Sequence, residues 1–570
     1  MNYSIFLNYF IILSNMITKK YKKYEIKQTK ETMESYCQPK KFKLQPQQAF
    51  LADYFSSKDA PSGMLIFHQI GAGKTCAAIA VAEKMKKKLN IVVVLPAALI
   101  GNFMDELRSP CPNVDYITVA EKQKLEKLKI DDKEYKQIIK KTEDRIKKYY
   151  TIYSYHKFID LAQTKKIKLK NTLLIIDEVQ NMVSLTGTFY KVLKNLIDKS
   201  DNTLRILILS ATPMFDRPSE IGLTLNLLKP KVEFPIGSDF NQKFLEGNGL
   251  VYKPINMNKF NELSKGLVSY YRGAPPYTYP EEIFKVVKCQ MSDFQYKSYL
   301  TALSAEGDYI KGAFKNVDLL NLPGNFFLGP RMVSNVAFPN KSIGILGSSS
   351  LINETLQLQN IGKYSIKFQK IFKKIKKADG PCFVYSNFKD LGGICSFVKF
   401  IEYHGYKNYK VHGEGPLRYA TWTGDEPHHM KEEIKSIFNK KDNTDGSKIS
   451  IMLGSPSVKE GVSFKRVRQV HILEPYWNMS RILQIIGRAI RFCSHNDLPK
   501  VDRNVEVYLY LATHTGDKTI DQYIWSLAKK KNELISYFEK ALKEGAVDCQ
   551  LFYHRNVYPT DDIKLKCTNN

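Results

Sequence analysis

The first stretch of this chain with the residue types for phosphate chemistry is the turn GAGKT at 71–75. It follows a short apolar run and precedes a helix-forming stretch. Gly71, Ala72 and Gly73 allow a tight turn in which consecutive backbone N–H groups point into one small cup. The N-terminus of the following helix adds partial positive charge there, so the cup suits a phosphate group.

Side chains on either side of this turn extend the prediction to a nucleoside triphosphate. Lys74 can reach the β- and γ-phosphates, and the Thr75 hydroxyl can take one coordination position of Mg²⁺. Gln48, some twenty residues upstream, is expected to pair with the edge of adenine, although a surface glutamine is the default alternative. His68 stands where the P-loop pattern has its first glycine, which argues against a small-GTPase or kinase-like loop. A chance glycine turn is disfavoured by the complete strand–turn–helix context.

A second cluster is the acidic pair at the end of the apolar run TLLIIDEVQNM (172–182). Open α/β sheets bind their ligands at the carboxyl ends of strands, where Asp177 and Glu178 would lie. Asp177 is predicted to hold Mg²⁺, and Glu178 to orient and deprotonate an attacking water molecule. A polar strand exit without function is the alternative, and the nearby P-loop disfavours it.

A third cluster lies far downstream, in RILQIIGRAIRFCSH (481–495). Read as a helix, this segment places Gln484, Arg488 and Arg491 on one face, because they are spaced by four and three residues. Across a cleft from a P-loop they would stabilise charge on the transferred phosphate, an effect of about 10³–10⁵ in rate for an arginine finger. The alternative is a salt-bridged surface.

The elements that must position these clusters form two α/β patterns. Buried apolar strands alternate with helical stretches over 44–225, which predicts a parallel-sheet P-loop domain. A second such pattern covers 359–515 and has no GKT loop of its own. It would therefore complete the first domain's site with its arginines and couple hydrolysis to domain closure.

The remaining segments have weaker patterns. Residues 1–43 are expected to be an N-terminal extension, poorly ordered over 1–32, with Met33 as an alternative start. Residues 226–358 are interpreted as a mostly helical insertion or linker, and 516–570 as a helical C-terminal tail.

Bulk properties narrow the class of protein. The chain has 570 residues and a net charge of +29, which favours a polyanionic partner, most simply nucleic acid; the alternative is solvated surface lysine. Its nine cysteines are scattered without a C-x-x-C pair, which excludes the common zinc spacings, predicts no disulfide framework and favours a reducing compartment. No apolar run is long enough to cross a membrane.

Together, these motifs resemble those of superfamily 2 helicases and translocases, which have two RecA-like domains. Over about 44–515 the family's motifs occur in order: LQPQQ (44–48), HQIGAGKT (68–75), DEVQ (177–180), SAT (210–212), WTG (422–424), GSPSVKEGVSF (454–464) and QIIGRAIR (484–491). Two departures are visible. Gln45 stands where an arginine is common, and Gln180 replaces the histidine of the DEAH-type motif.

EGVSF, HILEPYWNMSRILQIIGRAIRFCSHNDLP and KEGAVDC resemble more closely a group of proteins from large DNA viruses. These are the nucleoside triphosphate phosphohydrolase I and early transcription factor small-subunit ATPases. The resemblance implies an ATP- and Mg²⁺-dependent translocase that acts on DNA rather than RNA during viral transcription. It implies a viral RNA polymerase or transcription factor subunit as partner, and a location in the virion and the host cytoplasm. A duplex-unwinding RNA helicase and a non-catalytic, ATP-clamped transcription factor are the alternatives.

Overall fold

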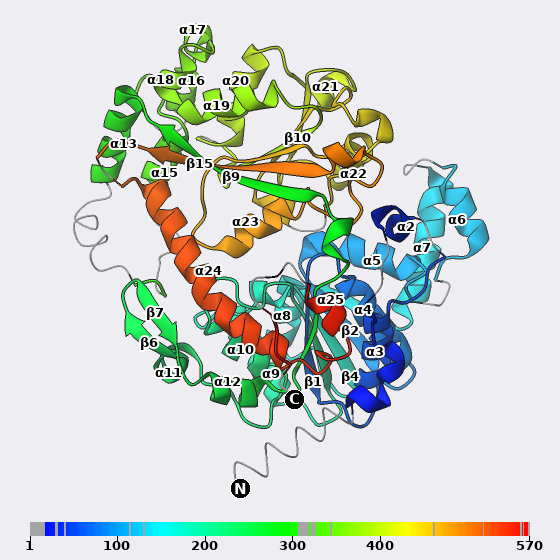
Figure 1. Cartoon of the computed structure of the whole chain (residues 1–570). Coiled ribbons are helices and arrows are strands. Elements are labelled where there is room, and N and C mark those ends of the chain that lie inside the picture. Colours follow the sequence, from blue (N-terminus) through cyan, green and yellow to red (C-terminus); the bar gives the residue numbers. More distant parts are fainter. Residues whose placement is uncertain are drawn as a thin grey trace.

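The computed structural model of the chain is shown in Figure 1. It describes residues 17–28, 32–38, 41–112, 116–128, 132–305, 318–320, 327–342, 345–390, 392–459, 462–516, 518–558, 561 and 564–567.

The first domain is built on a six-stranded sheet with every neighbouring pair parallel, in the order β3-β2-β4-β5-β1-β8. Its central strands are buried along their whole length, as their unbroken apolar sequences predict, because helices cover both faces of the sheet. The strands are β1 (Gly63–His68), β2 (Asn90–Leu95), β3 (Tyr150–Ser154), β4 (Thr172–Asp177), β5 (Arg205–Leu209) and β8 (Val268–Tyr271).

Alternate residues of this sheet enter two separate cores. One face packs on α3, α4 and α5, and the other on α8, α9 and α10. The helices of this half are α3 (Pro46–Phe55), α4 (Lys74–Met85), α5 (Ile100–Arg108), α6 (Val119–Leu125), α7 (Lys133–Lys147), α8 (Tyr155–Gln163), α9 (Thr188–Asp198), α10 (Glu220–Asn226), α11 (Gly237–Phe244) and α12 (Met257–Ser264), with 3₁₀ turns η1 (Lys22–Tyr24), η2 (Ala97–Leu99) and η3 (Val179–Asn181).

The second domain has a seven-stranded parallel sheet in the order β11-β12-β13-β10-β14-β15-β9. The predicted pair of parallel-sheet α/β domains is therefore confirmed. The strands are β9 (Glu281–Gln290), β10 (Cys382–Tyr385), β11 (Lys407–Asn408), β12 (Arg418–Trp422), β13 (Ile451–Gly454), β14 (Gln469–Ile472) and β15 (Asn504–Thr513).

Helices again cover this second sheet (Figure 1). They are α13 (Asp293–Ala305), α15 (Leu328–Asn335), α16 (Ile345–Ser349), α17 (Asn353–Leu356), α18 (Ile361–Tyr364), α19 (Ile366–Ile375), α20 (Ile394–Tyr403), α21 (Tyr409–His412), α22 (His428–Phe438) and α23 (Met479–Ile486), with 3₁₀ turns η4 (Pro276–Thr278), η5 (Lys441–Asn443), η6 (Pro456–Lys459) and η7 (Lys500–Asp502).

Residues 226–358 differ from the predicted insertion. β8 completes the first sheet, and β9 pairs along its whole length with β15 of the second. β9 was missed because it is an edge strand: most of its side chains are exposed, so its sequence lacks the continuous apolar run of a central strand. The same interval contributes helices and an antiparallel hairpin of β6 (Leu245–Asn248) and β7 (Val251–Pro254).

The predicted C-terminal helix is α24 (Ile520–Glu544), which runs from one domain to the other (Figure 1). Its first half packs in a cluster with Trp477 of the second domain, and its second half enters the core of the first. Residues 547–556 then lie alongside β8, where the Val547 N–H donates to the Val268 carbonyl at 2.9 Å. Short helix α25 (Tyr553–Asn556) ends this segment.

The N-terminal extension is more structured than expected. Tyr21 is buried edge-on against Phe50, with ring centroids 5.4 Å apart, so residues 17–28 pack on the first domain. Residues 33–37 form helix α2 (Met33–Cys37), which lies against η4. Residues 1–16 and 29–31 lie outside the described residues.

The prediction of no disulfide framework is wrong. Three disulfides join Cys37 to Cys493, Cys76 to Cys111, and Cys549 to Cys567. The cysteines of two of these pairs are 35 and 456 residues apart in sequence, so no short cysteine spacing predicts the pairs. In the described part of the chain, no helix is both long and apolar enough to cross a membrane.

Candidate active site

The phosphate-binding turn lies between β1 and α4, and its shape depends on glycine. Gly71 and Gly73 have φ of +82° and +75°, the left-handed region that glycine enters without steric cost. A Cβ on Gly73 would also lie 2.5 Å from Gln48 Nε2. The turn therefore has the tight left-handed backbone that the GAGKT sequence predicts, and its role as a cup for an anion stays a prediction.

Gln48 lies against this loop rather than in the cavity beside it. Its Oε1 accepts from the Gln45 N–H at 2.9 Å, and its Nε2 donates to the Gly73 carbonyl at 3.2 Å. These two contacts cap α3 and fix that helix to the turn. The adenine contact of Gln48 stays a prediction.

His68, the departure from the P-loop pattern, is fully buried at the end of β1. Its Nε2 lies 3.0 Å from Ser269 Oγ, and Ser269 in turn donates to the buried carboxyl of Asp548. Burial, with a smaller contribution from Lys74, lowers the pKa of His68 to about 3. His68 is therefore neutral and ties the loop to the C-terminal segment instead of adding charge to the site.

The acidic pair lies at the carboxyl end of β4, as predicted. Asp177 is buried, and its Oδ1 accepts from the Glu178 N–H at 2.9 Å. Glu178 has φ of +51°, a conformation that costs a non-glycine residue free energy, and Tyr155 Oη donates to its carbonyl at 2.9 Å. This bend directs the carboxylate toward Lys74, whose Nζ lies 3.8 Å from Glu178 Oε1.

Gln180, the second departure, connects the acidic pair to the SAT motif. Its Nε2 donates to Glu178 Oε2, and its Oε1 accepts from Ser210 Oγ at 2.7 Å. The Ser210 hydroxyl also accepts from the Thr212 N–H at 3.0 Å. An amide thus fills the bridging place of the usual histidine.

The second domain contributes Gln484, Arg488 and Arg491, but not from a single helix. The prediction of a helix over 481–495 is wrong, because α23 ends at Ile486 and both arginines follow it outside any helix. Gln484 Nε2 reaches Thr212 Oγ1 of the first domain at 3.5 Å. Arg488 Nη1 donates to the Val462 carbonyl at 3.3 Å, and burial lowers the pKa of Arg491.

One cavity of about 430 Å³ brings the three clusters together. The predicted residues on its wall are Gly71, Gly73, Lys74, Thr75, Asp177, Glu178, Gln484, Arg488 and Arg491. Gln48 and Ala72 do not line it. Sequence reasoning missed Arg481, one turn before Gln484, whose guanidinium stacks on Tyr476 with its carbon 4.2 Å from the ring centroid. The sequence signal for Arg481 is its spacing of three residues from Gln484, which places both side chains on one helix face.

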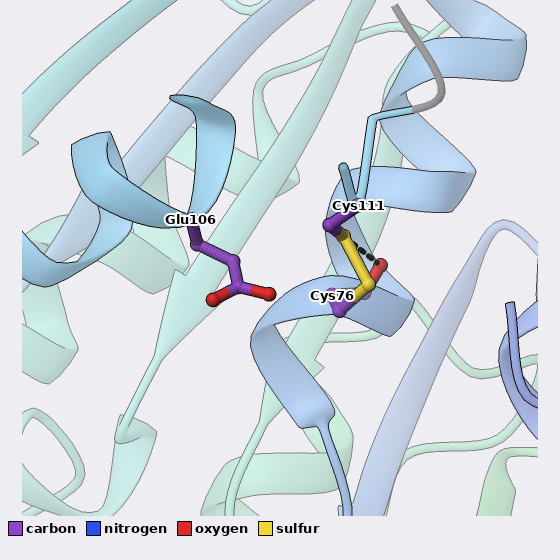
Figure 2. A group of neighbouring side chains, drawn as sticks. All are labelled: Cys76, Glu106 and Cys111. Atoms are coloured by element: carbon purple, nitrogen blue, oxygen red, sulfur yellow. Dashed lines mark hydrogen bonds between the residues drawn. A yellow bond between two sulfur atoms is a disulfide. The ribbon is translucent and has the colours of Figure 1, made fainter. Parts of the chain in front are cut away.

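Another part of the cavity wall is formed by Cys76, which follows Thr75, and by Glu106 of α5. Figure 2 shows Cys76 joined to Cys111 with Glu106 facing them. The donor atoms of the three residues lie within 4.8 Å of one another, the kind of cluster that can hold a metal ion. With the sulfurs bonded to each other, neither offers the thiolate that a metal requires.

Known proteins match nearly the whole chain. The SNF2-related domain family matches residues 33–322, and the helicase conserved C-terminal domain matches residues 366–493. A putative ATP-dependent RNA helicase of Acanthamoeba polyphaga mimivirus is 50% identical, over 96% of this chain and 97% of its own length. A termination factor NPH-I homolog of African swine fever virus (isolate Tick/Malawi/Lil 20-1/1983) is 27% identical, over 85% and 76%.

Among solved structures, the Hef helicase domain of Pyrococcus furiosus aligns with a TM-score of 0.41 at 13% identity. The alignment covers 84% of this chain and 97% of that one.

Proposed function

This chain belongs to the SNF2-related family of superfamily 2 helicases and translocases, and on that premise we propose that it is a DNA-dependent ATPase that translocates along duplex DNA. The family assignment itself supports nucleic-acid-dependent ATP hydrolysis by this chain. The observation that carries the mechanism is the single cavity in which the phosphate loop and acidic pair of one domain meet the arginines of the other.

In this proposal the first domain binds the triphosphate and activates water. Backbone N–H groups of the loop and Lys74 hold the phosphates, while the hydroxyl of Thr75 and the carboxylate of Asp177 supply the oxygen ligands that Mg²⁺ prefers. Bound Mg²⁺ would neutralise charge on the phosphates. Lys74 would exchange its contact with Glu178 for phosphate oxygens, which leaves the Glu178 carboxylate to accept a proton from water.

The second domain supplies positive charge only while the cleft is closed. Arg488 and Arg491 reach the cavity from the segment after α23, and Gln484 contacts Thr212 across the domain boundary. Nucleic acid that holds the two domains together would keep these side chains in place. That requirement gives a physical reason for stimulation of hydrolysis by nucleic acid.

Duplex DNA as the track is supported by the SNF2-related match and by the NPH-I homologs among the relatives. The net charge of +29 suits any polyanion and does not select DNA. A role in viral transcription, with a polymerase or transcription factor subunit as partner in virions and the host cytoplasm, belongs to the same proposal and rests on the same relatives.

A second candidate is a duplex-unwinding RNA helicase. The name of the mimivirus relative favours it, and the hairpin β6–β7 is an element of the kind that could separate strands. Strand displacement on a tailed RNA duplex, compared with hydrolysis on the same substrate, distinguishes unwinding from translocation alone.

The deciding experiment is steady-state ATP hydrolysis without nucleic acid and with single-stranded DNA, duplex DNA or RNA, each over a salt series. Lys74→Ala gives the background, and Arg488→Ala should lose about 10³–10⁵ in rate if the arginine acts on the transferred phosphate. Strong stimulation by duplex DNA that weakens steeply with salt is expected. Stimulation by RNA alone would replace the proposal with the helicase alternative, and ATP binding without turnover would leave the ATP-clamped transcription factor.

A further inference from the structure

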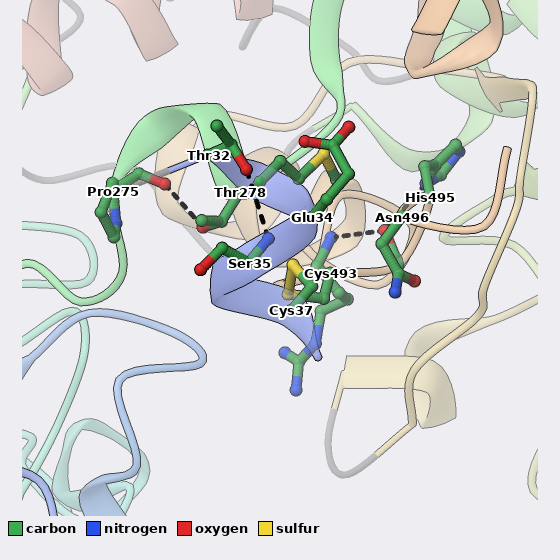
Figure 3. Close-up of a disulfide and its surroundings, with 12 residues drawn as sticks. Thr32, Glu34, Ser35, Cys37, Pro275, Thr278, Cys493, His495 and Asn496 are labelled. Carbon is green, nitrogen blue, oxygen red and sulfur yellow. Dashed lines mark hydrogen bonds between the residues drawn. A yellow bond between two sulfur atoms is a disulfide. The ribbon is translucent and has the colours of Figure 1, made fainter. Parts of the chain in front are cut away.

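The disulfide between Cys37 and Cys493 joins the N-terminal arm, defined here as α2 with its capping residue Thr32, to the second domain. Figure 3 shows Cys37 joined to Cys493. Their Cα atoms are 5.7 Å apart, and Cys493 is the second residue after Arg491. The Ser35 N–H donates to Thr32 Oγ1 at 3.3 Å, which caps the short helix. The cross-link therefore fixes this arm to the segment that follows Arg491.

This disulfide is the most accessible of the three. The four cysteines of the other two pairs are at most 7% exposed. Cys37 and Cys493 are each half-buried. Thiol–disulfide exchange requires a thiolate to reach a sulfur atom, so a small thiol should react with this pair before the two buried pairs.

A chain of aromatic contacts leads from the arm to the phosphate loop. The Tyr36 and Phe492 ring centroids are 5.9 Å apart, and those of Phe492 and Tyr279 are 6.3 Å apart. Tyr279 Oη lies 3.6 Å from the place of a Cβ on Gly71. The arm is thus linked to the phosphate loop through three aromatic side chains in sequence.

The turn at Cys493 is held in a conformation that needs support. Cys493 has φ of +53°, and its N–H donates to the Thr278 carbonyl at 2.9 Å. A non-glycine residue in the left-handed region persists only where its surroundings impose it. The disulfide is a covalent part of those surroundings.

Besides the disulfide, the arm is held by noncovalent contacts: Met33 is buried, Tyr36 packs against Phe492, and the Arg555 guanidinium carbon lies 5.4 Å from the centroid of the Tyr36 ring. Glu34 Oε1 pairs with Arg503 Nη1 at 2.6 Å, but the Glu34 side chain is 48% exposed, and such pairs contribute little. A five-residue helix is not stable on its own. Reduction should therefore loosen the arm, which then depends on these noncovalent contacts alone.

We propose that Cys37–Cys493 is an exchange site for small-molecule thiols and that its oxidised form positions Arg491 for ATP hydrolysis. This inference rests on the proposed function for its second half. A thiolate of the glutathione class attacks one sulfur, forms a mixed disulfide and releases the other cysteine, which takes a proton from water. A second thiol displaces the first, so that two thiols are oxidised to one small disulfide while two cysteine thiols form.

The first test measures exchange and does not depend on ATP. The full-length protein is equilibrated in buffers of graded ratios of reduced to oxidised glutathione, free thiols are blocked, and each cysteine peptide is quantified by mass spectrometry. Cys37–Cys493 should become reduced at a ratio of reduced to oxidised glutathione at least tenfold lower than the ratio that reduces either buried pair. If it opens together with them or after them, it is not an exchange site. This result stands even if the chain hydrolyses no ATP.

The second test links the pair to turnover. In saturating DNA, reduction should lower the kcat of the wild type at least threefold and change the KM for ATP less than twofold. Cys37→Ser should have the lowered kcat with or without reductant. Cys395→Ser, which removes an exposed free thiol, should respond as the wild type does. Equal rates for oxidised wild type and Cys37→Ser, or a response to reductant that persists in Cys37→Ser, would overturn the positioning role.

Discussion

Replacing Gln180 with leucine tests how Glu178, the proposed general base, is held. The leucine removes the amide that donates to Glu178 Oε2 and accepts from Ser210 Oγ, and it leaves the phosphate loop untouched. A hydrogen bond to a charged group contributes about 1.5–3 kcal/mol. Since 1.36 kcal/mol is a factor of ten in rate, kcat should fall about 10- to 150-fold. The KM for ATP should stay within about threefold.

The assay is phosphate release in saturating nucleic acid, with thermal melting to confirm that each variant is folded. Gln180→His offers another donor at the same place and should recover much of the rate. Ser210→Ala should add little to Gln180→Leu, because both changes break one chain of contacts and their effects are not additive. A kcat for Gln180→Leu within twofold of the wild type would show that Glu178 needs no such support.

Three further predictions concern the base, a buried ion pair and a buried acid. Glu178→Gln should reduce hydrolysis to the Lys74→Ala background while titration with a fluorescent ATP analogue still shows binding within threefold of the wild type. Lys367→Met leaves Asp521, 0% exposed, without its 2.6 Å partner, so urea unfolding should show a loss of about 3–5 kcal/mol. Adding Asp521→Leu should restore most of that loss. Burial raises the pKa of Asp548 from an ordinary 3.8 to about 7. Between these two values the folded state keeps a proton that the unfolded state releases. The stability that this proton contributes is therefore lost as pH rises from about 4 to 7. Asp548→Asn cannot ionise, and its melting temperature should vary less with pH over that window; an unchanged slope would contradict the assignment.

The sequence predicted best the parts that are local and buried on both sides. The strands before the GAGKT turn and before Asp177 are unbroken apolar runs, and only a parallel sheet covered by helices on both faces buries such runs completely. Because the carboxyl ends of these strands share one edge, placing Lys74 near Glu178 needed no knowledge of distant contacts. The order of motifs then identified the second domain.

The errors arose where distant contacts decide the structure. The sequence over 481–495 looks helical, yet α23 ends before Gly487, where a Cβ would lie 3.5 Å from Ile70 Cδ1 of the first domain. β9 becomes a strand only because β15, more than 200 residues later, offers it an edge. The cysteine pairs likewise depend on the complete fold.

The contact between residues 547–556 and β8 has a consequence for synthesis. Ser269 and Asp548 are 279 residues apart, yet their contact supports His68 at the start of the phosphate loop. At about 5–20 residues per second, a ribosome needs about 15–60 s to make the intervening chain. During that interval the nascent first domain has all of its nucleotide-binding residues but not the segment that covers its edge strand. A half-made chain therefore lacks the contact that ties His68 to the C-terminal segment until translation is nearly complete.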